Sequence, residues 1–447
     1  MSNLNNVNNH DEDDVSQYYP TDDTYNDGDD VFYSYNDKKK EKSKFKMTKF
    51  TSSQIIVLAI IFIIYTAVIF TAAWLIFYRP AQPSNNNIPF DTTPVEDATN
   101  NRTEPPLDNK ETTTPSESTS VVVNDDYTIK DGMYNILVVG RDDAATLADV
   151  TMIVNLDTKN NQISIMQIPR DTLVNVNVPT NKVNAAYSSY FSSAYKDGDE
   201  DPYLSAAEHY AALYEQNLCI NIHHTVVVNL AGFVNIVNLF GGVDVYVPEA
   251  MYYSDPEQDL YINIGAGQQH LDGYNAMCFV RYRSGYVQAD LGRVNAQKIF
   301  LTAFFRTVKN SISLTNVGML TDVANEVFKN VHTDMSVSDM IFYAKQLLSV
   351  NLDAIHMMTL PGNAAYYEYG GSYYVMNRAA ALEVINEYFN IYQTAISDSI
   401  FDRNTVFCIT SSTSICNTYY AAADAVLDGV YNAEDIDSES IYIPHLN

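Results

Sequence analysis

The sequence predicts a mixed α/β domain, with a central β-sheet covered by helices, preceded by a single transmembrane helix. Apolar runs of strand length alternate with segments of helical period from residue 127 to residue 393. Hydrophobic residues make up 46% of the 447-residue chain, which is enough for a large core. One uncharged apolar segment stands apart near the N-terminus, and its length is that of a membrane span.

The first 50 residues are predicted to be a disordered tail that ends in a basic stretch. Residues 1–37 are rich in Asn, Asp and Tyr, and they have too few aliphatic side chains to bury a core. Lysines then crowd the stretch from Lys38 to Lys49. Because lysine-rich flanks stay on the cytoplasmic side of a membrane span, the tail is expected in the cytoplasm and the chain after Arg79 outside the cell.

Residues 55–78 carry no charge and are expected to form a transmembrane signal anchor. As a helix the segment would be roughly 36 Å long, enough to cross a hydrocarbon core of about 30 Å. A cleaved signal peptide would have a shorter apolar stretch that begins nearer the N-terminus. The expected location is therefore the cell membrane, crossed once, with the α/β domain on the extracytoplasmic side.

Two further segments flank the domain predicted at 127–393. Residues 79–126 are rich in Pro, Thr, Asn, Ser and acids, so they are expected to be a flexible linker. Residues 394–447 form an acidic C-terminal extension, and the sequence leaves open whether it packs on the domain.

The four cysteines are too few for a disulfide framework. Cys219 and Cys278 lie in apolar runs and are predicted to be buried thiols. Cys408 and Cys416 flank a Ser/Thr segment, where an oxidising exterior would permit a disulfide that the sequence does not decide.

Within the domain, the elements are predicted from hydrophobic periodicity and turn residues. Strands are expected at 133–140, 151–157, 163–169, 223–229, 243–247 and 276–283, with a hairpin turn joining the second to the third. Helices are expected at 203–216, after the 223–229 strand through Phe240, and at 290–309, 316–330 and 336–349.

The charge balance excludes one class of function. Acidic residues outnumber basic ones by 55 to 26, which gives a formal net charge of −29. Nucleic-acid binding depends on Lys and Arg displacing counterions, so no nucleic acid is expected as a partner. An anionic ligand must instead be held by a local cluster of cations. Such a cluster is indicated by the arginines, most of which fall between Arg141 and Arg306.

Two carboxylates, Asp142 and Asp149, follow the first predicted strand across a short loop. Gly140 is expected to let the backbone turn sharply there. Two carboxylates that return to one place can hold a hard divalent cation such as Mg²⁺. The alternative is that both are ordinary turn residues.

Arginines stand near the ends of two other predicted strands. Arg170 follows the 163–169 strand, with a surface pair to the next residue, an aspartate, as its alternative role. Arg281 and Arg283 lie two apart in a predicted strand, so both guanidiniums would project from one face. Guanidiniums held together repel unless an anion lies between them, and their fork fits phosphate. Pairing with nearby acids is the alternative.

A polar stripe is predicted on the 290–309 helix. Asp290, Arg293 and Gln297 lie at positions i, i+3 and i+7, hence on one face. The stripe is either a solvated face or one wall of a polar site.

Taken together, these segments closely resemble the LytR-CpsA-Psr (LCP) family, also called cell envelope-related transcriptional attenuator domain proteins. The resemblance rests on NILVVGRDD (135–143), ADVTMIVNLD (148–157), ISIMQIPRDT (163–172), KVNAAY (182–187), FGGVDVYVP (240–248), LDGYNAMCFVRYR (271–283) and DLGRVNAQ (290–297). The order and approximate spacing are similar too, and the resemblance covers residues 135–389.

The resemblance implies an LCP phosphotransferase, which transfers a glycopolymer from a polyprenyl-pyrophosphate lipid to a sugar hydroxyl of peptidoglycan. The expected partners are these two substrates and the lipid bilayer. By motif, Asp142 and Asp149 are expected to hold Mg²⁺ (or Mn²⁺), and either is available as the base for the attacking hydroxyl. Arg170, Arg281 and Arg283 are expected to clamp the pyrophosphate. Such transfer depends on positioning and charge neutralisation.

The resemblance also assigns Asp290, Arg293 and Gln297 to the polar helix face beside that site, with Arg293 and Gln297 helping to bind pyrophosphate. The lipid tail requires a long apolar pocket, which is expected between the sheet and the helices.

The chain departs from the family's pattern at two positions. Many relatives have Arg two residues before the second metal-site Asp, where this chain has Leu147. Many also have Arg just before the helix glutamine, where it has Ala296. The clamp is therefore expected to use Arg141, a choice that rests on proximity alone, so that Arg141→Ala would reduce turnover severely.

Three other functions compete with this interpretation. A binding module would hold the lipid-linked precursor without transferring it, and a pyrophosphate hydrolase would use water in place of the sugar hydroxyl. Transcriptional regulation is opposed by the expected topology and by the acidity of the tail. The sequence does not reveal which polymer is carried, whether teichoic acid, capsule or another polysaccharide, or which sugar accepts it.

Overall fold

The computed structural model describes residues 127–405 except 143–146, 175, 177, 259, 287–289, 314–315 and 368–370, together with 60–61, 63–64, 66, 78–80, 88–91, 430–433 and 436. The chain divides into two units, residues 1–64 and 65–447. In the first unit the described residues are helical and exposed, while the predicted tail and most of the predicted anchor lie outside the described residues. Among those that are described, no helix is long and apolar enough to cross a membrane.

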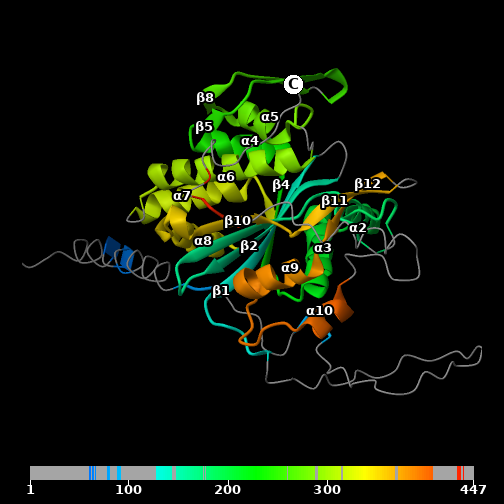
Figure 1. Cartoon of the computed structure of the whole chain (residues 1–447). Coiled ribbons are helices and arrows are strands. Elements are labelled where there is room, and N and C mark those ends of the chain that lie inside the picture. The colour runs from blue at the N-terminus through cyan, green and yellow to red at the C-terminus, as the bar shows by residue number, and fades with distance from the viewer. Residues whose placement is uncertain are drawn as a thin grey trace, which may run out of the picture. The chain divides into compact units, whose positions relative to one another are not determined.

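The second unit is built on a mixed seven-stranded sheet with the order β13-β10-β3-β2-β1-β4-β9 (Figure 1). The strands are β1 Met133–Arg141, β2 Ala148–Asp157, β3 Gln162–Gln167, β4 His224–Asn229, β9 His332–Thr333, β10 Ile355–Thr359 and β13 Tyr431–Asn432. Strands β1 to β3 form an antiparallel meander, whereas β4 runs parallel to β1 and β10 parallel to β3. The predicted central sheet is therefore confirmed as mixed.

The predicted hairpin between β2 and β3 is confirmed, and the side chain of Asp157, the last residue of β2, stabilises its turn. Asp157 Oδ1 accepts hydrogen bonds from the backbone N–H groups of Lys159 and Asn160, both at 3.0 Å. Asn161 then adopts a left-handed conformation with φ of 54°, which asparagine tolerates better than most residues.

Helices cover both faces of the sheet (Figure 1). One layer contains α2 Val183–Asp197, α3 Pro202–Leu218, α9 Arg378–Val384 and α10 Asp398–Asn404, and the other α4 Leu230–Leu239, α5 Gly273–Arg281, α6 Asp290–Ser311, α7 Val317–Phe328 and α8 Val337–Ser349. Side chains of β1 alternate between the layers: Leu137 and Val139 join the core on the α2–α3 side, and Tyr134 and Ile136 the core on the other side. A strand buried on both faces is apolar throughout, which is why its sequence does not alternate.

Within the described part of the chain, three two-stranded sheets lie outside the central one. They pair β5 Val243–Val247 with β8 Gly267–Leu271, β6 Met251–Asp255 with β7 Leu260–Ile264, and β11 Gly362–Tyr367 with β12 Gly371–Met376. Of these strands only β5 was predicted.

The strand predicted at 276–283 is wrong, because this segment forms helix α5. Asp272 caps the helix by accepting a hydrogen bond from the backbone N–H of Asn275 at 2.8 Å. A short apolar run fits either period, and the capping aspartate was the signal that favoured a helix.

Residues near both ends of the domain pack on it. Phe90, expected in the flexible linker, is 7% exposed and contacts the rings of Tyr127 and Tyr392, so residues 88–91 do not form a free spacer. In the C-terminal extension, Phe401 of α10 is buried and β13 pairs with β10. This part of the extension therefore belongs to the domain.

The buried thiols are confirmed at Cys219 and Cys278. Burial raises the pKa of Cys219 to about 12, so that thiol stays protonated. Cys408 and Cys416 lie outside the described residues.

Candidate active site

A charged pocket of about 220 Å³ lies where β1, β2 and β3 meet α5 and α6. It is lined by Asp142, Leu147, Asp149, Arg170, Tyr253, Leu260, Arg281, Arg283, Ser284 and Arg293. Four arginines and two aspartates give the lining a formal excess of two positive charges, although the chain as a whole carries −29. The local cation cluster that the sequence required for an anionic ligand is therefore present.

The sheet brings the two aspartates together. Asp142 follows β1, Asp149 is the second residue of β2, and the two strands pair antiparallel with Arg141 opposite Ala148. The sharp turn expected at Gly140 is not there, because β1 continues through Arg141 with a register shift between these two residues. What Gly140 provides is close approach, since a Cβ at that position would lie 3.1 Å from Cβ of Val150.

Arg281 and Arg283 both line the charged pocket, as predicted, but not for the predicted reason. Arg281 is the last residue of α5, and Tyr282 then takes an extended conformation that leads the chain to Arg283. The Tyr282 ring is buried and packs edge-on against Tyr286, with centroids 5.3 Å apart. This buried ring fixes the helix exit from which the two arginines reach the pocket.

Ion pairs connect the arginines to the aspartates. Arg281 Nη2 lies 3.2 Å from Asp142 Oδ2, and Arg170 Nη1 lies 2.7 Å from Asp149 Oδ1. The exposed fractions of these four side chains are between 14% and 27%, so the pairs remain accessible to a ligand. Each carboxylate holds one guanidinium in place at the wall of the pocket.

Helix α6 supplies Arg293, which is 6% exposed and lines the same pocket. The helix approaches the loop before it closely because residue 292 is glycine: a Cβ there would lie 2.5 Å from Cβ of Tyr286. Burial raises the pKa of Tyr286, so its hydroxyl stays neutral beside the site. Asp290 begins α6, and its side chain lies outside the described part.

Gln297 is placed apart from the charged pocket. Its Nε2 donates to the carbonyl of Val280 at 3.2 Å, and its Oε1 accepts from Gln167 at 3.4 Å. These bonds tie α6 to α5 and β3, and the side chain lines a neighbouring apolar cavity. The residues of the predicted polar helix face therefore line two different spaces. Arg293 lines both the charged pocket and the apolar cavity, and Gln297 lines only the cavity.

Arg141 is also not among the residues that line the charged pocket. Its guanidinium carbon lies 4.8 Å from the ring centroid of Phe191 and 4.3 Å from that of Tyr203. The side chain is 3% exposed and holds α2 and α3 against the end of β1 through cation–π contacts. The prediction that Arg141 contacts the phosphates rested on its proximity to Asp142 in the sequence, but consecutive strand residues point to opposite faces. Arg141 lines the apolar cavity and not the charged pocket.

The apolar cavity has a volume of about 280 Å³ and lies between the sheet and helices α4, α5 and α6. Its apolar lining consists of side chains such as Val138, Met152, Phe233, Ile236 and Leu301. It shares Asp149, Arg281 and Arg293 with the charged pocket, so the two spaces adjoin at charged side chains. A cavity between sheet and helices is where a lipid tail was expected.

The two aspartates fit a small hard cation. Mg²⁺ is commonly held by one or two carboxylates together with substrate phosphates and water, and Asp142 and Asp149 line one pocket. Within the described residues there is no group of three or more His, Cys, Asp or Glu side chains that would form a complete protein cage. The donor set therefore suits a cation that arrives with a phosphate ligand.

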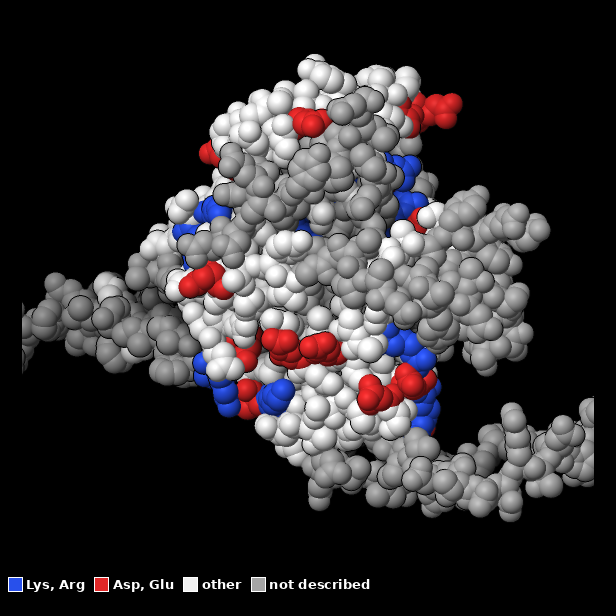
Figure 2. Space-filling model, in the orientation of Figure 1, with Lys and Arg blue, Asp and Glu red and all other residues white. Residues whose placement is uncertain are grey.

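Over the described part of the face shown in Figure 2, basic and acidic side chains lie beside one another in small mixed groups.

The fold and the site together define an α/β domain in which an arginine-lined pocket adjoins an apolar cavity between the sheet and the helices. The chain belongs to the LytR_cpsA_psr family, whose profile matches residues 97–390, and the predicted family is confirmed.

Relatives and a solved structure were found for the same region. The chain is 27% identical over 274 residues to the polyisoprenyl-teichoic acid–peptidoglycan teichoic acid transferase TagV of Bacillus subtilis strain 168, covering 59% of this chain and 66% of that protein. It is 28% identical over 258 residues to the similarly named TagU of Bacillus cereus, covering 57% and 77%. The crystal structure of B. subtilis TagV is 28% identical, with a TM-score of 0.46, and covers 57% of this chain and 95% of that one.

Proposed function

We propose that this protein is a phosphotransferase that moves a glycopolymer from a polyprenyl-pyrophosphate lipid to a sugar hydroxyl of peptidoglycan. The observation that carries the proposal is the junction of the charged pocket with the apolar cavity, which share Asp149, Arg281 and Arg293. The names of TagV and TagU, which pair polyisoprenyl-teichoic acid with peptidoglycan, support it. Teichoic acid is accordingly the proposed class of polymer.

The arginines would act on the charge of the pyrophosphate. Arg170, Arg281 and Arg283 present guanidinium groups that bind phosphate oxygens through paired hydrogen bonds. In the reaction the acceptor oxygen forms a bond to the phosphorus that carries the glycopolymer, and the bond from that phosphorus to the bridging oxygen breaks. The lipid leaves as its monophosphate, and the arginines stabilise the negative charge that develops on it.

Asp142 and Asp149 are the proposed residues for Mg²⁺ (or Mn²⁺), and the bound ion would neutralise phosphate charge. The proton of the acceptor hydroxyl needs a base, for which these two carboxylates are the candidates. Of the two, Asp149 has the more exposed side chain, at 27% against 14% for Asp142. Asp149 is therefore the proposed base.

We also propose that the protein is a single-pass protein of the cell membrane with this domain outside the cell. The uncharged segment at 55–78 and the lysines before it support this topology. A lipid substrate would then approach from the same membrane in which the chain is anchored.

The test is a transfer assay with the full-length chain in detergent, a polyprenyl-pyrophosphate saccharide and a peptidoglycan oligomer, with and without Mg²⁺. Mass spectrometry would detect the adduct in which a phosphodiester joins the saccharide to the oligomer. A Mg²⁺-dependent adduct is expected, and it should be reduced in the Asp149→Asn variant, which keeps the shape of the side chain.

The competing functions give different products in the same assay. Lipid that binds and stays intact would identify a binding module instead. Free saccharide phosphate without adduct would identify a pyrophosphate hydrolase.

A further inference from the structure

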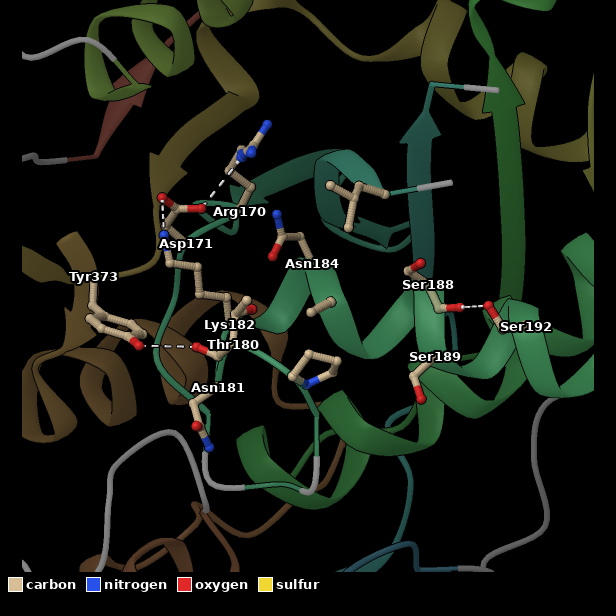
Figure 3. A pocket seen from close by; sticks show the side chains of 13 residues that line it. Arg170, Asp171, Thr180, Asn181, Lys182, Asn184, Ser188, Ser189, Ser192 and Tyr373 are labelled. Atoms are coloured by element: carbon tan, nitrogen blue, oxygen red, sulfur yellow. Dashed lines mark hydrogen bonds and ion pairs between the residues drawn. The ribbon is translucent and has the colours of Figure 1, made fainter. Parts of the chain in front are cut away.

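A third space, the polar groove, adjoins the charged pocket and is shown in Figure 3. Its volume is about 780 Å³, and it is lined by Leu147, Arg170, Asp171, Pro179, Thr180, Asn181, Lys182, Asn184, Ala185, Ser188, Ser189, Ser192 and Tyr373. Leu147 and Arg170 also line the charged pocket, whereas no residue of the apolar cavity lines the groove. The groove and the cavity therefore adjoin the charged pocket through different residues.

Hydroxyl and amide groups dominate the wall that α2 contributes. Asn184, Ser188 and Ser192 follow one another at four-residue spacing, so they lie on one face of the helix. Hydroxyls and carboxamides both donate and accept hydrogen bonds, as the hydroxyl and acetamido groups of amino sugars do. A wall of this kind suits a neutral carbohydrate better than a second anion.

Asn184 is the residue that points to a ligand. It is 4% exposed, and its backbone N–H donates to the carbonyl of Arg170 at 3.2 Å, which fixes the start of α2 beside the charged pocket. Figure 3 shows its carboxamide directed into the space between Arg170 and Ser188. No hydrogen bond joins that carboxamide to the other described residues, and Asn184 lines the groove, so its amide and carbonyl are open to a ligand there.

Contacts between the other walls keep the groove in shape. Lys182 Nζ lies 2.8 Å from Asp171 Oδ2 and 5.3 Å from the ring centroid of Tyr373. The Tyr373 hydroxyl donates to the carbonyl of Thr180 at 3.0 Å. Asp171 in turn pairs with Arg170 Nε at 3.4 Å, so the wall of the groove and the arginine of the charged pocket are held as one unit.

We infer that the polar groove binds the acceptor sugar, and that Asn184 positions it by hydrogen bonds to a hydroxyl or acetamido group. The inference rests on the proposed function. In phosphoryl transfer the attacking and leaving oxygens lie roughly in line through the phosphorus, so the acceptor enters opposite the departing lipid phosphate. The apolar cavity takes the lipid, and the groove is the space on the charged pocket that shares no lining with that cavity.

The test uses three variants of the full-length chain in detergent. Asn184→Leu removes the carboxamide at nearly constant size, and Ser189→Trp fills the groove from an exposed position that disturbs no buried side chain. Lys196→Ala, exposed on the same helix and not part of the groove lining, is the matched control. Thermal unfolding of each variant shows whether it folds, and Ser189→Trp keeps the test valid should Asn184→Leu not fold.

Two measurements separate the acceptor from the donor. In steady-state transfer, Asn184→Leu should raise the KM for a peptidoglycan oligomer by about fivefold to tenfold, because one or two neutral hydrogen bonds to the acceptor are lost. The KM for the lipid donor should stay unchanged. In calorimetry, wild type and Lys196→Ala should bind a tetrasaccharide of β-1,4-linked N-acetylglucosamine, and Ser189→Trp should not.

Two other results would overturn the inference, and a third would separate it from the proposed function. A raised donor KM with an unchanged acceptor KM would overturn the inference, because the groove would then hold the first sugars of the donor. Unchanged KM values with unchanged tetrasaccharide binding would overturn it as well. The wild-type chain could bind the tetrasaccharide without making the adduct, while both groove variants lose this binding. That result would support the groove as a sugar site and count against only the proposed function.

Discussion

The two ends of strand β1 hold polar groups in opposite ways. Near its start, Asn135 donates from Nδ2 to the carbonyls of Asn221 and Phe389, both at 3.0 Å, and accepts from Asn155 at 2.7 Å. Its backbone N–H donates to Nδ1 of His223 at 3.0 Å. At the other end the chain passes into Asp142 and the charged pocket, where carboxylates and guanidiniums face an open space.

The difference teaches which polar groups serve the fold and which serve the site. The network at the start of β1 is neutral, and Asn135 and Asn155 within it are 0% and 2% exposed, so its bonds replace water and stabilise the sheet. At the end of β1 the paired charges are partly exposed and leave room for a ligand. Changes at the first end should therefore cost stability, and changes at the second should cost activity.

The largest expected effect is at the charged end. Arg281→Ala combined with Arg283→Ala should reduce transfer by at least about 100-fold, because removal of even one preorganised donor to a developing charge commonly costs that much. The melting temperature should fall much less than the rate, because Arg283 is exposed and the ion pair of Arg281 with Asp142 is partly exposed. Initial rates of adduct formation and thermal unfolding of the same preparation measure the two quantities.

A charge-matched control separates a local from a global effect. Lys159→Ala combined with Lys329→Ala also removes two positive charges, from exposed pairs with Asp131 and Glu326 far from the site in sequence. This control should transfer at the wild-type rate. An equal loss of rate in the control would mean that net charge, not the pocket, determines activity.

The neutral end should respond in the opposite way. Asn135→Ala removes three side-chain hydrogen bonds and leaves two buried carbonyls and the Asn155 amide without their partner, which should lower the free energy of unfolding by about 3 kcal/mol. Urea unfolding measures this change. Transfer per folded molecule should be unchanged, and a loss of rate in the folded fraction would show that the two ends are coupled.

Much of the fold followed from the sequence because apolar periodicity records burial directly. Strands β1 to β5 and helices α3, α4, α6, α7 and α8 were predicted, since each has a clear period or an apolar run bounded by turn residues. The 276–283 segment failed because a short run that is buried on several sides has no clear period. Strands β11 and β12 and helix α2 were not predicted, because the sequence there mixes tyrosine, alanine, serine and asparagine without a distinct apolar stripe. Strand β10 was not predicted either, although Ile355–Thr359 is a short apolar run, and β13 is only two residues long.

The sequence predicted which residues form the candidate site better than it predicted how the structure places them. The structure brings Asp142, Asp149, Arg170, Arg281, Arg283 and Arg293 together in one pocket. Tyr253 also lines it and was missed, because nothing in a tyrosine between polar residues indicates contact with a distant strand end. Asn184 was quoted within a family motif without a role, and only its burial and its direction single it out.

A smaller effect is expected from pH at the neutral end. Burial and the neighbouring His224 lower the pKa of His223 to about 4, from an ordinary value of 6.5. The unfolded chain therefore binds a proton at this site in the range from pH 6.5 to pH 4, where the folded chain does not, so stability falls as the pH falls through this range. The expected loss is about 2 kcal/mol between pH 7 and pH 5.

Urea unfolding at these two pH values checks the prediction against a matched variant. His223→Gln removes the titrating group and should show a smaller loss than the wild type, while His209→Gln, at an exposed position of α3, should lose as much as the wild type. Equal losses in all three proteins would mean that other groups control the acid sensitivity.

The smallest expected effect is at Arg141, which lies at the charged end and yet contacts aromatic rings. Arg141→Met keeps the length of the side chain and removes the two cation–π contacts, so it should lower stability by about 1 kcal/mol. Its effect on transfer should be much smaller than that of Arg170→Met, because Arg170 lines the charged pocket. Rates and melting temperatures of both variants make the comparison. If Arg141→Met and Arg170→Met lost the same rate at an unchanged melting temperature, the Arg141 guanidinium would be assigned to the phosphates. The position of a charge at the end of β1 would then determine its role even when its contacts are aromatic.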